Sequence, residues 1–92
     1  MNQYEEINFA SPKAIIPNNT KAQVLNGIDA KLKNLKIQAE IRDDIIILNS
    51  IISIEDILND AYNITMYRFQ FQNLINIINE EIRNIEDIIE YS

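Results

Sequence analysis

Adjacent carboxylates come closer than any other residues of this sequence to a pattern that could bind a metal ion. Aspartate and glutamate stand side by side at Asp43-Asp44, Glu55-Asp56, Glu80-Glu81 and Glu86-Asp87. Sequential neighbours on an α-helix point about 100° apart, so no pair presents two oxygens to one ion unaided. We therefore expect these carboxylates to form solvated helix faces.

Two further carboxylate pairs have the i, i+3 spacing of the helical Mg²⁺ sites of all-α nucleotide hydrolases. They are Glu40–Asp43 and Asp87–Glu90, and in a helical hairpin they would lie far apart. The chain has no histidine and no cysteine, which removes the commonest general base and the thiolate ligands of zinc. We expect no catalytic residue, metal, cofactor or small-molecule substrate. Magnesium-dependent turnover of a nucleotide would instead support an α-helical enzyme.

The composition is that of one small helical domain. The 92 residues are 47% apolar and include one glycine and two prolines. This is too apolar for a disordered chain and too poor in turn residues for an all-β fold. The net charge of −6 lies in residues 54–92, because residues 1–53 carry equal numbers of acidic and basic side chains. An acidic protein without a basic face is a poor candidate for direct nucleic-acid binding.

Nothing in the sequence is typical of export or of a membrane span. Residues 1–6 lack the basic and then apolar regions of a signal peptide. The most apolar window, residues 45–54, is shorter than the roughly 20 residues that cross a bilayer. We expect a cytoplasmic protein, in the host cytoplasm if the source is viral, without a membrane partner.

A heptad pattern over residues 54–89 predicts a long amphipathic helix with a coiled-coil-like seam. A capping box at residues 20–23 and a cap at Ser53 predict helices over about residues 20–49 and 53–91, with the turn at residues 49–53. The expected fold is all-α, a long antiparallel helical hairpin after an irregular arm of residues 1–19. The predicted oligomer seam comprises Ile57, Ile64, Phe71, Ile75, Ile78, Ile82, Ile85 and Ile89.

Two local signals leave other arrangements open. Asn26-Gly27 could form a β-hairpin turn, although an interior glycine costs a helix only about 1 kcal/mol. Weak helix formers cluster at residues 59–63. A break there, with Thr65 capping a third helix, would produce a three-helix bundle.

The apolar face of the second helix predicts self-association. On a helical wheel it covers an arc of about 160°, wider than the roughly 100° stripe of an ordinary surface helix. A lone hairpin would leave part of this arc in water. We therefore expect a homodimer that forms a four-helix bundle.

Two polar residues interrupt the predicted seam. Asp60 falls among the apolar positions, where it would pair with a lysine or mark a change of helical phase. Arg68 takes a seam position and is predicted to set the register of the helices, paired with Asp60, Asp43 or Asp44.

A second apolar patch is predicted to contact a partner. Tyr62, Met66 and Phe69 are spaced i, i+4, i+7, so on one helix they share a face, with Leu58 adjoining. Tyrosine, phenylalanine and methionine are enriched at interfaces. Alternatively, the N-terminal arm or the first helix covers this patch. The leading function is a small non-catalytic protein–protein interaction module, either an adaptor or an assembly factor.

The acidic end of the second helix supports a second function. Such a surface could occupy a basic nucleic-acid-binding surface of a target protein, as phage-type or antitoxin-like inhibitors do, in a salt-sensitive complex. A salt-tolerant complex lost on Phe69→Ala would instead favour the adaptor. The acidic surface consists of Glu80, Glu81, Glu86, Asp87 and Glu90.

Overall fold

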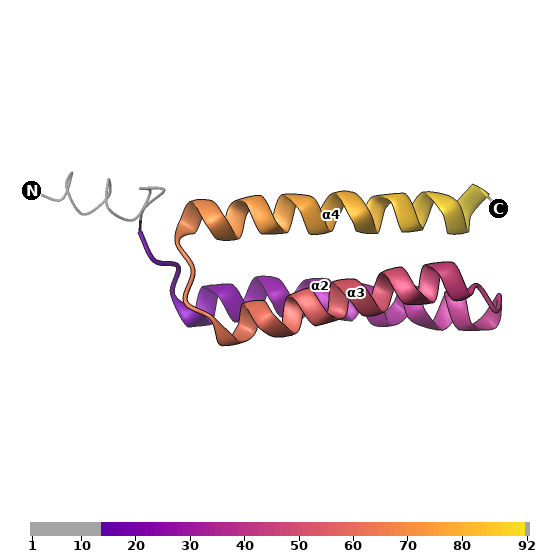
Figure 1. Ribbon diagram of the computed structural model, residues 1–92, viewed down its shortest axis with the longest axis horizontal. Coiled ribbons are helices and arrows are strands. Elements are labelled where there is room, and N and C mark those ends of the chain that lie inside the picture. The colour runs from indigo at the N-terminus through magenta and orange to yellow at the C-terminus, as the bar shows by residue number, and fades with distance from the viewer. Residues whose placement is uncertain (1–13, 92) are drawn as a thin grey trace, which may run out of the picture.

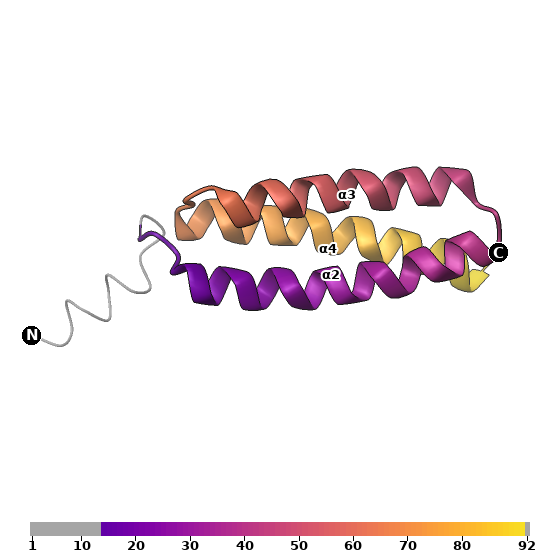
Figure 2. The same ribbon diagram turned by 90° about the horizontal axis from the view of Figure 1, so that it is seen from below.

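The computed structural model describes residues 14–91, which form three α-helices. They are α2 (Asn18–Ile41), α3 (Ile45–Asn63) and α4 (Arg68–Tyr91). In Figures 1 and 2, α3 runs back alongside α2, and α4 then returns in the direction of α2. The all-α class is confirmed for the described residues, whereas most of the predicted N-terminal arm lies outside them. None of the three described helices is both long and apolar enough to cross a membrane.

The two predicted helices are divided differently in the structure. The expected turn at residues 49–53 is helical, and it lies within α3. The Ser50 and Ser53 hydroxyls donate to the carbonyls of Ile46 and Asn49, at 3.1 Å in each case. These polar side chains therefore bond within the helix and do not end it. The prediction of a single second helix over residues 53–91 is also wrong, because residues 64–67 separate α3 from α4.

The alternative three-helix arrangement is closer to the structure, with a different cap. The third helix begins at Arg68 and is not capped by Thr65. The backbone N–H of Tyr67 donates to Oε1 of Gln70 at 3.0 Å. A glutamine at the third position of a helix reaches back in this way in one half of a capping box.

The turn between α2 and α3 is formed by the Asp43-Asp44 pair. Asp43 has a φ of 57°, in the left-handed region, and its N–H donates to the Glu40 carbonyl at 3.1 Å. The N–H of Asp44 donates to the Ala39 carbonyl at 3.0 Å, which completes a Schellman motif. The Asp44 carboxylate then accepts from the N–H of Ile47 at 3.1 Å and caps α3.

Backbone hydrogen bonds join the start of the described chain to the connection between α3 and α4. The N–H of Ile16 donates to the Met66 carbonyl at 3.0 Å, and the N–H of Arg68 donates to the Ala14 carbonyl at 2.7 Å. These two bonds flank a single antiparallel bridge between residues 15 and 67. The segment before α2 therefore fixes the point at which α4 begins.

Basic side chains from the two ends of α2 bind carbonyls at the ends of the other helices. Lys21 is buried, with 3% of its surface exposed, and its Nζ donates to the carbonyl of Ile64, the C-cap of α3. Nη2 of Arg42 donates to the carbonyl of Ile89 in the last turn of α4, at 2.6 Å. Cations are favoured at helix C-termini, where carbonyls lack intrahelical donors. In residues 14–91 no buried side-chain nitrogen or oxygen lacks a partner.

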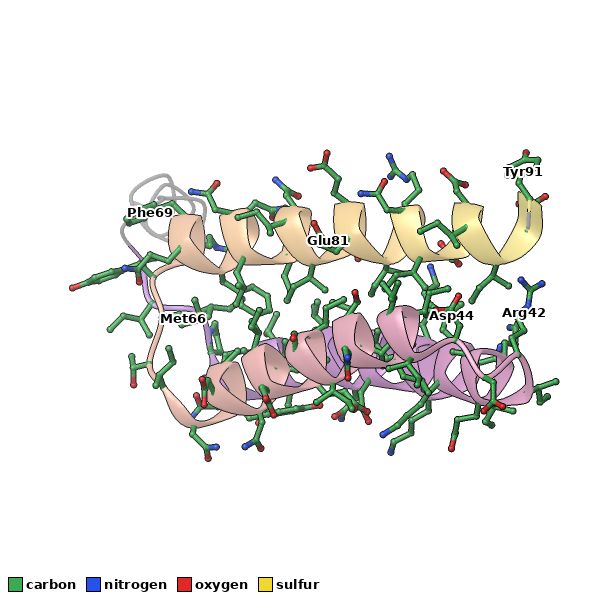
Figure 3. The ribbon with its side chains drawn as sticks, turned by 45° about the vertical axis from the view of Figure 1, so that its right-hand side comes forward. Arg42, Asp44, Met66, Phe69, Glu81 and Tyr91 are labelled. Atoms are coloured by element: carbon green, nitrogen blue, oxygen red, sulfur yellow. The ribbon has the colours of Figure 1, made fainter. Side chains whose placement is uncertain are left out.

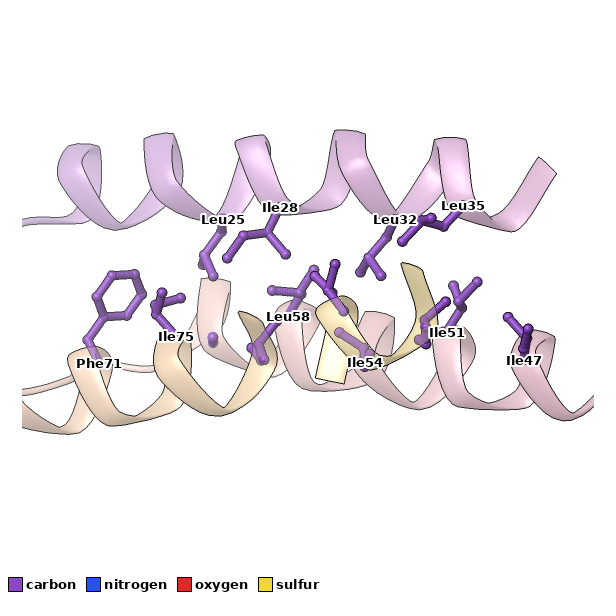
Figure 4. Close-up of a cluster of buried hydrophobic side chains, with 14 of the residues drawn as sticks. Leu25, Ile28, Leu32, Leu35, Ile47, Ile51, Ile54, Leu58, Phe71 and Ile75 are labelled. Carbon is purple, nitrogen blue, oxygen red and sulfur yellow. The ribbon is translucent and has the colours of Figure 1, made fainter. Parts of the chain in front are cut away.

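The hydrophobic core runs along the bundle axis and receives side chains from all three helices (Figure 4). Ile16 and Met66 close one end of it. Leucine and isoleucine side chains buried to this degree each contribute about 1.5–3 kcal/mol. The helical core residues are Leu25, Ile28, Leu32, Leu35 and Ala39 from α2, Ile47, Ile51, Ile54, Leu58 and Ala61 from α3, and Phe71, Ile75, Ile78, Ile82, Ile85 and Ile89 from α4.

Replacement of Asp43 should change stability in the direction set by its left-handed backbone. We expect Asp43→Gly to raise the free energy of unfolding by about 0.5–1 kcal/mol, because glycine adopts positive φ without a Cβ clash. Asp43→Val should lower it, because a β-branched side chain is strained there. Thermal unfolding of the three proteins measures the order. A stabilising Asp43→Val would contradict this account of the turn.

Gly27 lies within α2 and not in a β-hairpin turn. An added Cβ at Gly27 would meet no heavy atom within 4 Å. Gly27→Ala should therefore raise the free energy of unfolding by about 0.5–1 kcal/mol, since alanine loses less backbone entropy in a helix. Urea denaturation measures the change, and a lower midpoint would show that α2 is not helical through this position.

Candidate interaction surface

The paired carboxylates do not assemble a metal site in the described part of the chain. Asp43 and Asp44 form the α2–α3 turn, so Glu40 and Asp43 are not a pair on one helix. Asp87 and Glu90 are exposed on α4. Within residues 14–91 no group of three or more acidic, histidine or cysteine side chains could hold a metal ion.

Most of the predicted oligomer seam lies inside this single chain. Its members in α4 are buried against α2 and α3, whereas Ile57 and Ile64 are exposed. The break at residues 64–67 is the reason, because it separates the two halves of the heptad pattern and lets α4 fold back. The buried members are Phe71, Ile75, Ile78, Ile82, Ile85 and Ile89.

The predicted partner-binding patch is not one helix face. Leu58 is 2% exposed and Met66 is also buried, whereas Tyr62 and Phe69 are exposed. The rings of Phe69 and Tyr67 stack with centroids 6.2 Å apart. Figure 3 shows Met66 and Phe69 at the end of the bundle where α4 begins. The i, i+4, i+7 spacing fails because it crosses the connection between two helices, and a binding role for these residues stays a prediction.

Asp60 and Arg68, the polar residues of the predicted seam, are not buried in the bundle. Asp60 is exposed on α3. Arg68 is partly buried at the first position of α4, where its backbone N–H bonds to Ala14. A change of helical phase at Asp60 stays a prediction, and α3 ends three residues later, at Asn63. A register-setting role for Arg68 stays a prediction.

The predicted acidic surface occupies α4. Four of its members are exposed, while Glu86 is partly buried and lies 3.9 Å from Nζ of Lys31 on α2. An ion pair this exposed contributes at most about 1 kcal/mol. The exposed members are Glu80, Glu81, Asp87 and Glu90.

Four of the isoleucines exposed on α3 and α4 make a further surface, and of these only Ile57 belonged to the predicted oligomer seam. Ile46 and Ile57 lie eleven residues apart on α3, and Ile77 and Ile88 lie eleven residues apart on α4. Eleven residues make three helical turns, so each pair shares one face. Their exposed fractions are 80%, 42%, 60% and 51% in that order. We call these four residues, with Ser50 and Ser53 between the first two, the α3–α4 surface.

Contacts with α2 show on which side the α3 members of this surface lie. Nζ of Lys36 on α2 lies 3.3 Å from Oε1 of Glu55 on α3, so Glu55 marks the flank of α3 beside α2. Ile57 follows Glu55 by two residues, about 200° around the helix. Ile57 therefore lies on the flank away from α2, which borders α4.

The same reasoning places the α4 members of the surface. Glu86 marks the flank of α4 beside α2, through its ion pair with Lys31. Ile77 and Ile88 are nine and two residues away, about 180° and 200° around the helix. Because α3 runs opposite to α4 (Figure 1), Ile46 and Ile88 lie toward one end of this surface, and Ile57 and Ile77 toward the other.

The α3–α4 surface has carboxylates and no basic side chain of its own. Glu81 follows Ile77 by four residues on the same face of α4 and is exposed midway along the helix (Figure 3). Asp60 follows Ile57 by three residues and is exposed on α3. The hydroxyls of Ser50 and Ser53 donate to carbonyls of their own helix. These two serines therefore present small side chains that need no outside partner.

Among the other exposed apolar side chains, Val24 and Ile37 are on α2 and Ile52 is on α3, and several more lie at the two ends of the bundle. Ile41 and Ile45 flank the α2–α3 turn, and Tyr91 is at the end of α4. Tyr67 and Phe69 are at the opposite end. The α3–α4 surface, in contrast, has members along two helices. The signal that identifies it in the sequence is the repeated eleven-residue spacing, which has meaning once the break at residues 64–67 is known.

No protein-family model, curated protein or solved structure matches this chain. The functional argument therefore rests on the side chains alone.

Substitution of Tyr62 on α3 tests its contact with α2. Its phenol donates to Oδ1 of Asn26. Desolvation, and to a smaller extent the charge of Asp29, raises the pKa of Tyr62, while Lys33 lowers this pKa by less. We expect Tyr62→Phe to lower the free energy of unfolding by about 0.5 kcal/mol below pH 10. Because the folded-state pKa is raised, this difference should disappear as pH rises through it.

A double-mutant cycle with Asn26→Ala checks the Tyr62 hydrogen bond. Chemical denaturation at pH 7 should show that the double variant is less destabilised than the sum of the single variants. Strict additivity would contradict a bond between these two side chains.

Proposed function

We propose that this protein is a small non-catalytic protein–protein interaction module, an adaptor or assembly factor that contacts its partner through the α3–α4 surface. A cytoplasmic location belongs to the same proposal. The observation that carries it is that four isoleucines are exposed on the flanks of α3 and α4 away from α2, two near each end of the bundle. Single exposed apolar residues are common, whereas apolar side chains that gather on one side of a protein mark interaction sites.

Partner binding through Tyr62 and Phe69 remains part of the proposal in a modified form. Their exposed rings lie on different helices, and Tyr62 already bonds to Asn26. Phe69 stacks on Tyr67 near the start of α4. Phe69 would extend a contact centred on Ile57 and Ile77, because the α3–α4 connection adjoins that end of the surface. Tyr62 lies on the flank of α3 beside α2, so a contact through its ring would be a separate one.

A second candidate function is an inhibitor that occupies a basic nucleic-acid-binding surface of a target protein. The exposure of Glu80, Glu81, Asp87 and Glu90 on α4 favours it. Such a complex would depend on charge and weaken as salt rises. Binding by the interaction module, in contrast, would depend mainly on burial of the exposed isoleucines of the α3–α4 surface in the interface.

Capture from an extract of the source cells tests the proposed function. The immobilised protein should retain a defined partner, and Ile57→Ser/Ile77→Ser should lose it, because two apolar contacts are removed. Ile37→Ser is the control, since Ile37 on α2 is 57% exposed, close to the 60% of Ile77. Ile37→Ser should retain the partner. Circular dichroism checks that all three proteins are folded.

The same experiment separates the two candidates. Retention that survives Ile57→Ser/Ile77→Ser but is lost with Glu80→Gln/Asp87→Asn/Glu90→Gln, or on raising the salt, would favour the inhibitor. Equal retention by the parent protein and all of the variants would show that neither surface binds the partner.

A further inference from the structure

We infer that the α3–α4 surface binds one amphipathic helix with basic flanks, which lies between α3 and α4 as the fourth helix of a bundle. This inference rests on the proposed function and specifies the chemistry of the partner.

The shape of the surface favours a helix. The flanks of α3 and α4 away from α2 each carry two exposed isoleucines, and four-helix bundles are completed by a further helix packed against two neighbouring ones. Ser50 and Ser53 lie between Ile46 and Ile57, and their small side chains allow a helix to approach closely. Helices dock in such places through apolar residues at i, i+3, i+4 and i+7.

The length of the surface sets the length of the partner helix. Ile46 and Ile57, like Ile77 and Ile88, are separated by eleven residues, which is about 16 Å along a helix. A partner helix of about four turns, or 14 residues, would cover both ends.

The carboxylates of the surface select basic residues on that helix. Asp60 adjoins Ile57 on α3, and Glu81 lies between Ile77 and Ile88 along α4. In the part of the chain that the structure describes, α3 has no basic residue and α4 has only Arg68 and Arg83. Lysine or arginine on the partner would meet these carboxylates favourably and speed its association.

The same charge argues against a second copy of this chain. A twofold contact would place the α3–α4 surface of one protomer on that of the other, so that acidic α3 and α4 helices would face one another. The reason for expecting a homodimer is also weaker, because the broad apolar arc of α4 is largely covered by α2 and α3 in one chain. Like charges brought together in an interface are unfavourable.

Three designed peptides serve as probes. The first is a peptide of leucine and lysine of about 14 residues, with the leucines on one helical face and lysines on both flanks. The second has the same composition in an order that gives no apolar face. The third replaces every lysine of the first with glutamate. Fluorescence anisotropy at about 0.15 M salt, where surface charges are screened beyond about 8 Å, measures binding to the full chain.

The first peptide should bind, and the second and third should bind at least about tenfold more weakly, because each lacks the apolar stripe or the complementary charge. Ile57→Ser/Ile77→Ser should weaken binding of the first peptide by about tenfold or more. Ile37→Ser should leave it unchanged. Backbone NMR shifts caused by the first peptide should lie on α3 and α4 around the four isoleucines.

Equal binding of the first and second peptides would overturn the inference, since it would show attraction by charge alone. Stronger binding of the glutamate peptide, or NMR shifts confined to α2, would also overturn it. Sedimentation that shows a dimer lost with Ile57→Ser/Ile77→Ser would assign the surface to a second copy.

Failure of the inference can be distinguished from failure of the proposed function. If Ile57→Ser/Ile77→Ser loses the captured partner but the lysine peptide does not bind, only the partner class is wrong. If that variant changes neither capture nor peptide binding, the α3–α4 surface is not an interaction site.

Discussion

The break between α3 and α4 is the constraint on which the rest of the structure depends. A continuous helix would carry its isoleucines along one side and leave most of them without a neighbour. Four residues between Asn63 and Arg68 instead allow the chain to reverse, so that the apolar face of α4 meets α2 and α3. The backbone bonds from Ala14 and Ile16, and the Lys21 bond to the Ile64 carbonyl, fix this reversal. The carbonyls of Ile64 and Met66 and the N–H of Arg68, which the break leaves outside the helices' own hydrogen bonds, thus have partners.

The charges are distributed so that α2 joins the other two helices. Its lysines bind Glu55 on α3 and Glu86 on α4, and basic groups at its two ends bind carbonyls near the ends of those helices. Each exposed ion pair adds little stability, but together they occupy the acidic groups beside α2. The carboxylates on the other flanks of α3 and α4 are not neutralised by α2. One side of the bundle is consequently acidic and apolar at once.

The sequence predicted the helical class and most of the α4 core, because a 3.6-residue period in isoleucine is a strong signal. It did not predict where the helices end. Ser50 and Ser53 resemble a turn, but their hydroxyls can equally bond back within a helix. The true turn depends on Asp43 in a left-handed conformation that aspartate adopts only occasionally. The patch around Leu58 and Met66 failed for the same reason, since an error in one helix end changes which residues share a face.

The isoleucines of the α3–α4 surface cannot be explained by the core of this chain. Side chains at these positions lie on the flanks away from α2, because Ile57 is about 200° from Glu55 and Ile77 about 180° from Glu86, and they are exposed. Polar residues at all four positions would leave the observed core intact and reduce exposed apolar area. A bundle with eighteen buried apolar residues does not need them for folding. Their placement away from α2, in line on two helices and near carboxylates, is the observation on which the proposed contact with another helix rests.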